Sequence, residues 1–579
     1  MVKTRGEDAE GSVAQREAYG LRTERLGALP IVNHFLARLG LPALLTQGVP
    51  TRDRRCAVPY ATGLLVLLRS LVVQREPIYR QQETVATFAP AAFGVTSAEA
   101  ARLGDDTLGR ALDRLFRADR GTLLTQIIVA AVRAFGVALT ELHNDSTTVR
   151  FTGQYRAARG RVLGGRRAPW ITYGHSKDHR PDLKQLLVVL TTSADGGIPV
   201  EFRCADGNTN DATTHRETWE ALRKIAGRAD FLYVADSKLC TAETLEYLDR
   251  YGGRFVTVLP RSRREDAEFR AWIQTHAPVW EEVWNRPHPR RRNGPRDVWR
   301  VFRYPLPSRE GFPVIWVWSA LLALRQQETR RERLARAVQA LERLQQQLAG
   351  QRPRLRARRQ VELRVEEIRR RLSVERYLQV EVLAEQEHRF RQEHRGRPGP
   401  QTRYRRHTRR RWGLRWATDE RAIAADHQSD GMYPLLTNDR RLTPREVLEA
   451  HKRQPIIEKR FEQLKTVHEI APVLLKNEGR VEALFFLYFV ALLVQALIER
   501  ELRTAMSQER IPELPLYPEE RRCSRPSTEQ VLRLFSLTQR HTLLRGERVL
   551  RVFDPELTDL QRTVLHLLGI PEASYRHRA

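Results

Sequence analysis

The hydrophobic pattern changes near residue 137, and this change constrains the fold more than any other feature of the sequence. Apolar runs that are typical of strands occupy residues 137–145, 183–208, 231–238 and 254–262. The second run contains the hairpin turn signal Asp195-Gly196-Gly197, and a helical pattern at 215–226 follows it. The resulting order is strand, hairpin, helix, strand, helix, strand. It predicts an α/β fold with a mixed sheet.

The segments on either side of this sheet are predicted to be mainly helical. Residues 26–135 carry helical patterns separated by Pro and Gly. After residue 263, a Trp- and Arg-rich stretch precedes a heptad-like helical hairpin at about 334–372 and a basic segment at 402–416. We expect five parts: a helical N-terminal domain at 1–115, the first part of the core at 116–262, an insertion with the coiled hairpin at 263–430, the last part of the core at 431–510, and a C-terminal helical region at 511–579.

The net charge is strongly positive. Lys and Arg number 99 against 70 Asp and Glu, which leaves +29, while the hydrophobic content of 41% is typical of a folded protein. A folded protein with a polyanionic partner is the simplest interpretation, and nucleic acid is the commonest such partner. The alternative at this point is an Arg-rich or ribosome-associated protein whose charge has another origin.

Cysteine spacing and hydropathy narrow the class of protein further. Cys56, Cys204, Cys240 and Cys523 show no CxxC spacing, so neither a zinc ribbon nor a disulfide framework is indicated. Residues 1–25 lack the apolar core of a signal peptide. The longest apolar stretch, 483–494, has only 12 residues, and we interpret it as a buried helix. We therefore expect a cytoplasmic protein without a membrane span.

Two aspartates end apolar runs of the predicted sheet. Asp145 follows the first run, before the small residues 146–148, and Asp236 follows the third. Carboxylates at strand ends of one sheet can converge on one point, which is what a hard divalent cation requires. Taken alone, either residue is more often a turn former or a helix N-cap. The pair, in so basic a chain, favours a metal site.

A third carboxylate is predicted on a helix near residue 458. Glu458 lies seven residues after His451 and seven before Lys465, so on a continuous helix the three share a face with Gln454 and Phe461. Because Phe461 is apolar, we expect this face to pack inward and to place Glu458 beside the core, where an acid needs a partner such as a metal. The alternative is an ordinary amphipathic helix with its charges in solvent.

The motifs together resemble bacterial insertion-sequence transposases of the DDE class. The similarity is to the insertion-sequence-four superfamily, which has a Tyr-Arg-Glu-Lys signature around the third acid and a large insertion before it. Within it, the closest branch has a GHSKDHRPDLKQ-type motif. The residues that carry the resemblance lie at 143–148, 173–185, 193–211, 234–241, 435–439, 456–465 and 480–503, and the region from residue 26 resembles the N-terminal domain of that branch.

The resemblance implies an RNase H-like core with two Mg²⁺ ions, for which Mn²⁺ substitutes. Asp145, Asp236 and Glu458 would be the three acids and metal ligands, and Lys465 would contact a phosphate. His451 stands where the signature has Tyr, and Gln454 stands where it has Arg. A helix that begins at Pro455 would leave these two residues before it.

Further DNA-contacting residues are predicted around the sheet and in the insertion. The loop at 174–182, which contains Arg180, is expected to contact DNA or to order the active site, and zinc binding there is disfavoured. We also assign Lys184 to the DNA-binding set. Related transposases stack an extruded base on a Trp, and Trp284 and Trp299 flank the most basic stretch, although a core role is the favoured interpretation for either one.

The expected function is a DNA transposase that acts on terminal inverted repeats and target DNA as a homodimer, in a bacterial cytoplasm on the nucleoid. The N-terminal domain would read the repeats, and two metal ions would support cleavage and strand transfer. Two alternatives stay open. One is an RNase H-like nuclease or resolvase that cuts without joining, and the other is a domesticated DNA-binding protein without catalysis.

Overall fold

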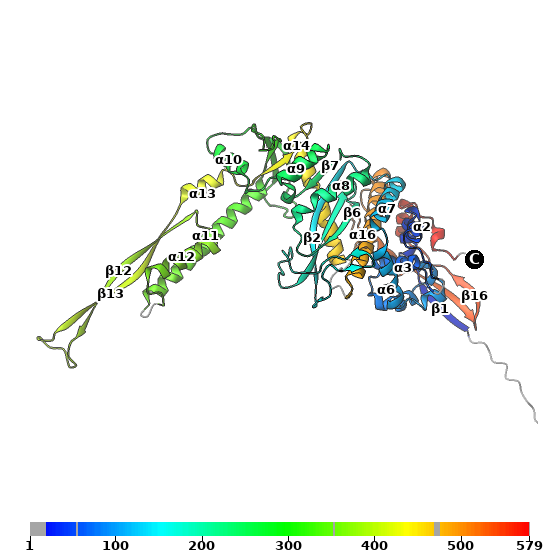
Figure 1. Cartoon of the computed structure of the whole chain (residues 1–579), viewed down its shortest axis with the longest axis horizontal. Helices are drawn as coiled ribbons and strands as arrows, with labels where there is room; N and C mark the ends of the chain where they lie inside the picture. The colour runs from blue at the N-terminus through cyan, green and yellow to red at the C-terminus, as the bar shows by residue number, and fades with distance from the viewer. Residues whose placement is uncertain (1–18, 54–55, 351–353, 468–474, 578–579) are drawn as a thin grey trace, which may run out of the picture. The chain divides into compact units, whose positions relative to one another are not determined.

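The computed structural model describes residues 19–53, 56–350, 354–467 and 475–577. The chain folds into two compact units (Figure 1). The first unit comprises Met1–Phe255 and His451–Ala579, and the second comprises Val256–Ala450. The second unit is therefore an insertion between two parts of the first.

A mixed sheet forms the centre of the first unit, as predicted. Its strand order is β6-β5-β2-β7-β8. The first three strands are antiparallel, and β2 pairs with β7 in parallel. This is the strand order of an RNase H-like core. The bounds are β2 Glu141–Phe151, β5 Lys184–Ser193, β6 Pro199–Ala205, β7 Leu232–Ala235 and β8 Arg254–Val258.

Helices follow the predicted order between and after the strands. The crossover from β6 to β7 contains α8, and α9 leads from β7 to β8. Glycines 196 and 197 both adopt positive φ in the β5–β6 turn, which confirms the predicted hairpin. The bounds are α8 His215–Ala226, α9 Ala242–Arg250, α14 Pro444–Arg453, α15 Pro455–Glu462, a π-helix η5 Gln463–Val467, and α16 Glu478–Gln508.

The 31-residue helix α16 is the core of the first unit. Its apolar stretch at 483–494 is buried, as expected, and the helix contacts β6, α3 and α6. By length and composition α16 could cross a membrane, and the bent pair α1–α2 passes the same test if counted as one span. However, 94% of the apolar window of α16 is buried inside the protein.

The N-terminal helices confirm the predicted helical pattern at 26–135. Their bounds are α1 Leu29–Arg38, α2 Leu41–Gly48, α3 Tyr60–Val73, α4 Gln81–Ala86, α5 Ser97–Ala100, α6 Asp105–Arg117 and α7 Arg120–Phe135. Strand β1, Tyr19–Arg25, precedes them.

The region at 511–579 differs from the all-helical expectation. It contains α17 Thr528–Phe535 and α18 Asp559–Leu567, but also β15 Gln539–Arg545 and β16 Arg548–Phe553. These two strands form a sheet with β1 in the order β1-β15-β16. The partner strand lies more than 500 residues away in sequence, at Tyr19–Arg25. Local pattern alone therefore did not identify this sheet.

The second unit combines an antiparallel sheet with a long helical hairpin. The sheet pairs the end of β8 with β14, followed by β11, β10 and β9. Its bounds are β9 Glu281–Arg286, β10 Asp297–Arg303, β11 Val314–Ser319 and β14 Met432–Thr437, with helices α10 Arg264–Trp272, α11 Ala320–Ala349, α12 Arg358–Arg371 and α13 Glu420–His427. The predicted hairpin corresponds to α11 and α12, and part of its predicted turn lies outside the described residues.

A two-stranded ribbon completes the core of this hairpin. Strands β12, Leu378–Gln392, and β13, Tyr404–Thr418, are antiparallel along their whole length. Val382 and Leu414 of the ribbon pack with Leu341 of α11 and Val365 of α12. The basic segment at 402–416 is therefore mostly strand, and its partner strand was not predicted.

Candidate active site

Strand register brings Asp145 and Asp236 together. The parallel pairing of β2 and β7 sets Asn144 opposite Ala235, and the two aspartates are the next residues along the chain, Asp145 within β2 and Asp236 just past the end of β7. Adjacent strands lie about 4.8 Å apart. Asp236 then caps the short 3₁₀ helix η4, Ser237–Leu239, by accepting a hydrogen bond from the Lys238 backbone at 2.9 Å. The predicted convergence of the two acids is thus a consequence of register.

Asp145 lies within β2, although we expected it at the end of a strand. The strand continues to Phe151 and pairs with β5 throughout. Residues 146–148 are Ser, Thr and Thr, and the pairing with β5 continues over them, whereas the pairing with β7 ends at Asn144. The small polar residues therefore extend the strand instead of turning the chain.

The Asp145 carboxyl is unusually basic for an aspartate. Burial raises its pKa to about 6, and the nearby acids Asp236 and Asp211 also raise it. Lys177 and a hydrogen bond from the Ser146 backbone, at 2.7 Å, oppose this shift. A carboxyl in this environment favours a cation as its neighbour.

The loop at 174–182 supplies that positive charge. Lys177 Nζ lies 3.8 Å from Asp145 Oδ1 and 2.8 Å from Asp211 Oδ2. It also donates to the backbone oxygen and hydroxyl of Ser146, at 2.7 and 2.8 Å. The loop therefore contributes directly to the arrangement of the site. Sequence reasoning did not single out Asp211, although it lies in the 193–211 motif.

A network of buried polar side chains lies beside the two aspartates. Thr191 Oγ1 donates to Asn144 Oδ1 at 2.9 Å, and Asn144 Nδ2 lies 3.4 Å from His215 Nδ1. His215 Nδ1 is also 3.0 Å from the Tyr233 hydroxyl. Burial lowers the pKa of His215 to about 4, so its ring is neutral near pH 7. This network joins β2, β5, β7 and α8 beside Asp145.

Glu458 lies on α15 but is exposed, whereas we expected it beside the core. The buried face of the helix carries Ile457, Arg460, Phe461 and Leu464, at the spacing of one helical stripe. Glu458 flanks that stripe. Helix α15 contacts β2 and β5. Among the described residues, no three His, Cys, Asp or Glu side chains gather closely enough to form a metal site.

The signature positions around Glu458 lie on a nearly continuous helical segment. Gln454 has helical φ and ψ and joins α14 to α15, which begins at Pro455. His451 lies in the last turn of α14, and burial lowers its pKa to about 3. Lys465 lies on the π-helix η5 and donates to Asp178 Oδ1 at 2.8 Å. The loop at 174–182 therefore contacts this segment as well.

The remaining predicted DNA-contacting residues have partners of their own. Arg180 forms a two-point pair with Asp182, at 2.8 and 2.7 Å, and Lys184 Nζ donates to the Gln154 backbone at 2.6 Å. Trp284 and Trp299 are in the second unit and face each other across β9 and β10, with ring centroids 6.3 Å apart. Both rings are half-buried.

Near the site, the carboxylate of Glu141 contacts two basic side chains. Glu141 begins β2 and accepts two hydrogen bonds from Arg453, at 2.6 and 2.7 Å. His143 Nε2 lies 2.8 Å from Glu141 Oε1. Burial by itself would raise the pKa of Glu141, but His143 and Arg453 outweigh burial and lower it to about 2. This cluster ties the end of α14 to the strand that bears Asp145.

Glu141→Gln is expected to lower the free energy of unfolding by up to about 3 kcal/mol at pH 7. Because the pKa of the folded state is the lower one, the stabilisation is complete above about pH 4.5 and disappears as the pH falls towards 2. Urea unfolding at pH 7, 5 and 3 measures the free energy of unfolding of both proteins. The difference in this free energy between variant and wild type should shrink as the pH falls. The control Glu246→Gln, at an exposed position of α9, should change the free energy of unfolding little at any pH.

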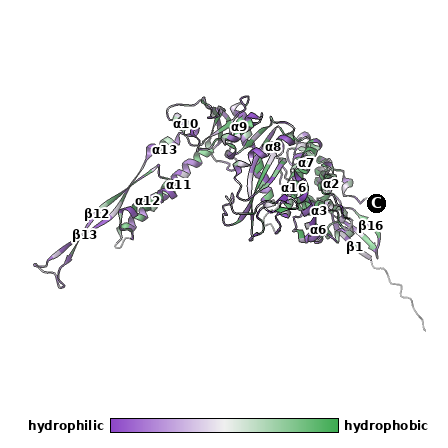
Figure 2. Ribbon diagram, viewed as in Figure 1, coloured by the Kyte–Doolittle hydropathy of each residue, from purple (hydrophilic) through white to green (hydrophobic). Residues whose placement is uncertain are grey.

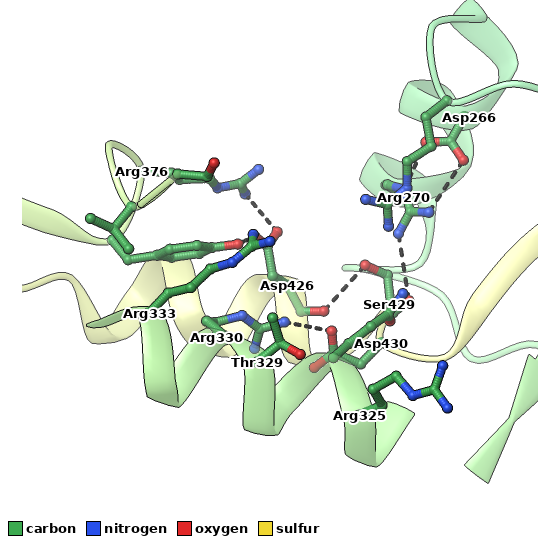
Figure 3. Close-up of a pocket in the computed structure, with 15 residues that line it drawn as sticks. Asp266, Arg270, Arg325, Thr329, Arg330, Arg333, Arg376, Asp426, Ser429 and Asp430 are labelled. Carbon is green, nitrogen blue, oxygen red and sulfur yellow. Dashed lines mark hydrogen bonds and ion pairs between the residues drawn. The ribbon is translucent and has the colours of Figure 1, made fainter. Parts of the chain in front are cut away.

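The second unit contains a separate arginine-rich pocket of about 500 Å³ (Figure 3). Three of its arginines are neutralised by aspartates. Arg270 pairs with Asp266. The other two pairs are Arg330 with Asp430 and Arg376 with Asp426. The first pair lies within α10, the second joins α11 to the turn after α13, and the third joins the segment before β12 to α13, which indicates a structural role for this pocket.

Comparison with known proteins identifies the family. The structure is similar to a chain of a solved complex titled "Cryo-EM structure of piggyBac transposase synaptic complex with hairpin DNA", with 11% identity and a TM-score of 0.26 over 50% of this chain and 59% of that chain. No curated protein matches the sequence. Residues 21–129 match a domain of unknown function, DUF4277. Residues 140–494, which include all three candidate acids, match the transposase DDE domain, and the chain therefore belongs to the DDE-domain transposase family.

Proposed function

We propose that the chain is a DNA transposase that binds the terminal inverted repeats of an insertion sequence, cleaves the element ends and joins their 3′-hydroxyls to target DNA. The observation that carries this proposal is the parallel register of β2 and β7, which sets Asp145 beside Asp236. The proposal includes membership of the insertion-sequence-four superfamily and action in the bacterial cytoplasm as a homodimer.

Two of the three proposed ligands, Asp145 and Asp236, follow paired residues of β2 and β7 and suit a hard divalent cation, whereas the exposed Glu458 does not complete a three-carboxylate cluster with them. DDE transposase domains generally use divalent metals, and carboxylate oxygens are the ligands that Mg²⁺ prefers. The raised pKa of Asp145, caused by burial and by neighbouring acids, indicates a site that favours added positive charge. We assign Asp145 and Asp236 as ligands and Glu458, on the helix that contacts β2, as the third. When bound, two Mg²⁺ or Mn²⁺ ions would activate water or a 3′-hydroxyl and stabilise the leaving oxygen.

The protein's own side chains position the acids and the DNA. The Ser146 backbone orients Asp145, and Lys177 holds Asp145 and Asp211 in place. We propose that Lys465 exchanges its partner Asp178 for a DNA phosphate. Further proposed DNA contacts, from both units, are His451, Gln454, Arg180, Lys184, Trp284 and Trp299. The N-terminal domain, 1–115, is the proposed reader of the repeats.

The test is a strand-transfer assay with the full chain and a pre-cleaved end. The end carries the inverted repeat that flanks the coding region, and a plasmid serves as target. We expect joined products with Mg²⁺ or Mn²⁺, and none when EDTA removes the metal. Cleavage without any joining would instead indicate a nuclease or resolvase. Repeat binding without either reaction would indicate a DNA-binding protein.

A further inference from the structure

The outer half of the β12–β13 ribbon concentrates positive charge. Between Gln386 and Arg410 the chain has nine arginines and two glutamates, a net charge of +7. Nearly all of these strand side chains are exposed. In Figure 1 the ribbon extends beyond the ends of α11 and α12, and Figure 2 colours its outer part mainly as hydrophilic. The outer ribbon is therefore a strongly charged surface with solvent on both faces.

The inner half of the ribbon has a different environment. Val382 and Leu414 are buried against α11 and α12, and Trp412 Nε1 donates to the Arg356 backbone at 3.0 Å. Gln345 of α11 accepts from the Leu414 backbone at 2.6 Å. The helices thus hold the base of the ribbon, while the apolar cluster, as far as the structure describes the chain, includes no residue of the outer half.

The cross-strand register of the outer half is unfavourable for the isolated protein. Arg391 lies directly opposite Arg405, and Phe390 lies opposite Arg406. Like charges in directly opposite positions destabilise a strand pair, and a two-stranded hairpin without an apolar face is only marginally stable. Among the described residues, Arg391, Arg405, Arg406 and Arg410 form no ion pair with a carboxylate. A polyanionic partner would remove this repulsion.

We propose that the outer β12–β13 ribbon lies in the major groove of B-form DNA and grips the duplex through its arginines. The major groove, about 12 Å wide, admits a two-stranded ribbon. The outer half has seven paired residues on each strand, 386–392 and 404–410, which span about 23 Å at about 3.3 Å per residue. Charged residues on an exposed strand edge also prevent the strand from pairing with other chains. A few charges are enough for that purpose, whereas the outer ribbon has nine arginines. The inference rests on the DNA-directed function proposed above and adds a contact outside the aspartate site.

The test compares two full-length variants with matched loss of charge. The ribbon variant is Arg391→Gln, Arg405→Gln, Arg406→Gln and Arg410→Gln. The control is Arg359→Gln, Arg364→Gln, Arg370→Gln and Arg371→Gln, which removes four exposed arginines of α12 in the same unit. Affinity for a 30-base-pair duplex of unrelated sequence is measured by fluorescence anisotropy over a salt series.

The ribbon variant is expected to bind the duplex roughly 10- to 100-fold more weakly at 0.1 M salt. The slope of log affinity against log salt should fall by up to about 3.6, because each lost phosphate contact removes about 0.9. The control should change much less in both measures. A second variant replaces residues 387–409 with an Asn-Gly turn, which joins the paired Gln386 and Arg410 directly. It removes eight arginines and should lose at least as much affinity as the ribbon variant.

Two results would overturn the proposal. Equal affinity of the ribbon variant and the control would show that the ribbon is not a DNA contact. An equal loss of affinity for double-stranded RNA, whose major groove is deep and narrow, would show unspecific charge attraction without groove insertion. Strand transfer by the wild-type protein is measured in parallel, so that the two proposals can fail separately. If strand transfer is absent while the ribbon variant loses affinity for DNA but not for RNA, the proposed function is wrong and the proposed DNA contact of the ribbon is supported.

Discussion

Asp145→Asn is expected to lower the rates of end cleavage and strand transfer by at least about a thousand-fold, because a bound divalent cation supplies several kcal/mol of transition-state stabilisation. The amide keeps the size of the side chain but removes the charge that a cation requires. The affinity for the inverted repeat should stay within about twofold of wild type, since the substitution removes no positive charge. Single-turnover cleavage and anisotropy measure the two properties separately. Asp236→Asn should behave in the same way.

The matched control is Asp230→Asn, which removes an exposed acid paired with Arg228 just before β7. It should cleave DNA like the wild type. Asp145→Cys provides a sharper test, because a thiolate is a softer ligand than a carboxylate and favours Mn²⁺ over Mg²⁺. Partial activity with Mn²⁺ alone would identify Asp145 as a ligand. Undiminished cleavage by Asp145→Asn would remove Asp145 from the site.

Arg460→Ala is expected to cost about 3–5 kcal/mol of stability, because it leaves a buried charge without its main partner. Arg460 is 2% exposed and its partner Glu499 is fully buried, with 3.0 Å between Arg460 Nη1 and Glu499 Oε2. Burial raises the pKa of Glu499, but Arg460 and other cations outweigh it and lower the pKa overall. Arg460 also donates to the backbone oxygens of Gly196 and Gly197, both at 2.8 Å. Guanidinium chloride unfolding at pH 7 measures the loss.

Lys459→Ala is the control for this prediction. Lys459 Nζ lies 3.4 Å from the same Glu499, but its side chain is 43% exposed, so its removal should cost less than about 1 kcal/mol. The double variant Arg460→Met and Glu499→Met should recover much of the lost stability, since it removes both charges at once. If Arg460→Ala unfolds at the same denaturant concentration as the wild type, the pair does not anchor α15 to α16 and the β5–β6 turn.

The core sheet was predictable from the sequence because its signals are local. Alternating and continuous apolar runs marked β2, β5, β6, β7 and β8, and the Asp195-Gly196-Gly197 turn marked the β5–β6 hairpin. The helical hairpin was equally visible in its heptad-like spacing. The ribbon strand β12 was missed because its outer half is polar on both faces and shows no hydrophobic alternation.

The site was only partly predictable, because its contacts join distant parts of the chain. The two aspartates were identified from the runs that precede them, but the position of Lys177 beside Asp145 depends on how a loop folds back over β2. The prediction that Glu458 lies beside the core was wrong, because its side chain is exposed. Phe461 indicated an inward face, yet the buried stripe of α15 passes beside Glu458 and includes the charged Arg460.

The sequence by itself determined the α/β class, the helical hairpin, the basic character and the two strand-associated acids, because hydrophobic period, turn residues and charge are properties of neighbouring residues. The tertiary structure decided the register that sets Asp145 beside Asp236, the pairing of β1 with β15 across the length of the chain, and the burial of Arg460 with Glu499. Each of these depends on backbone pairing or desolvation between segments far apart in sequence, which no local pattern specifies.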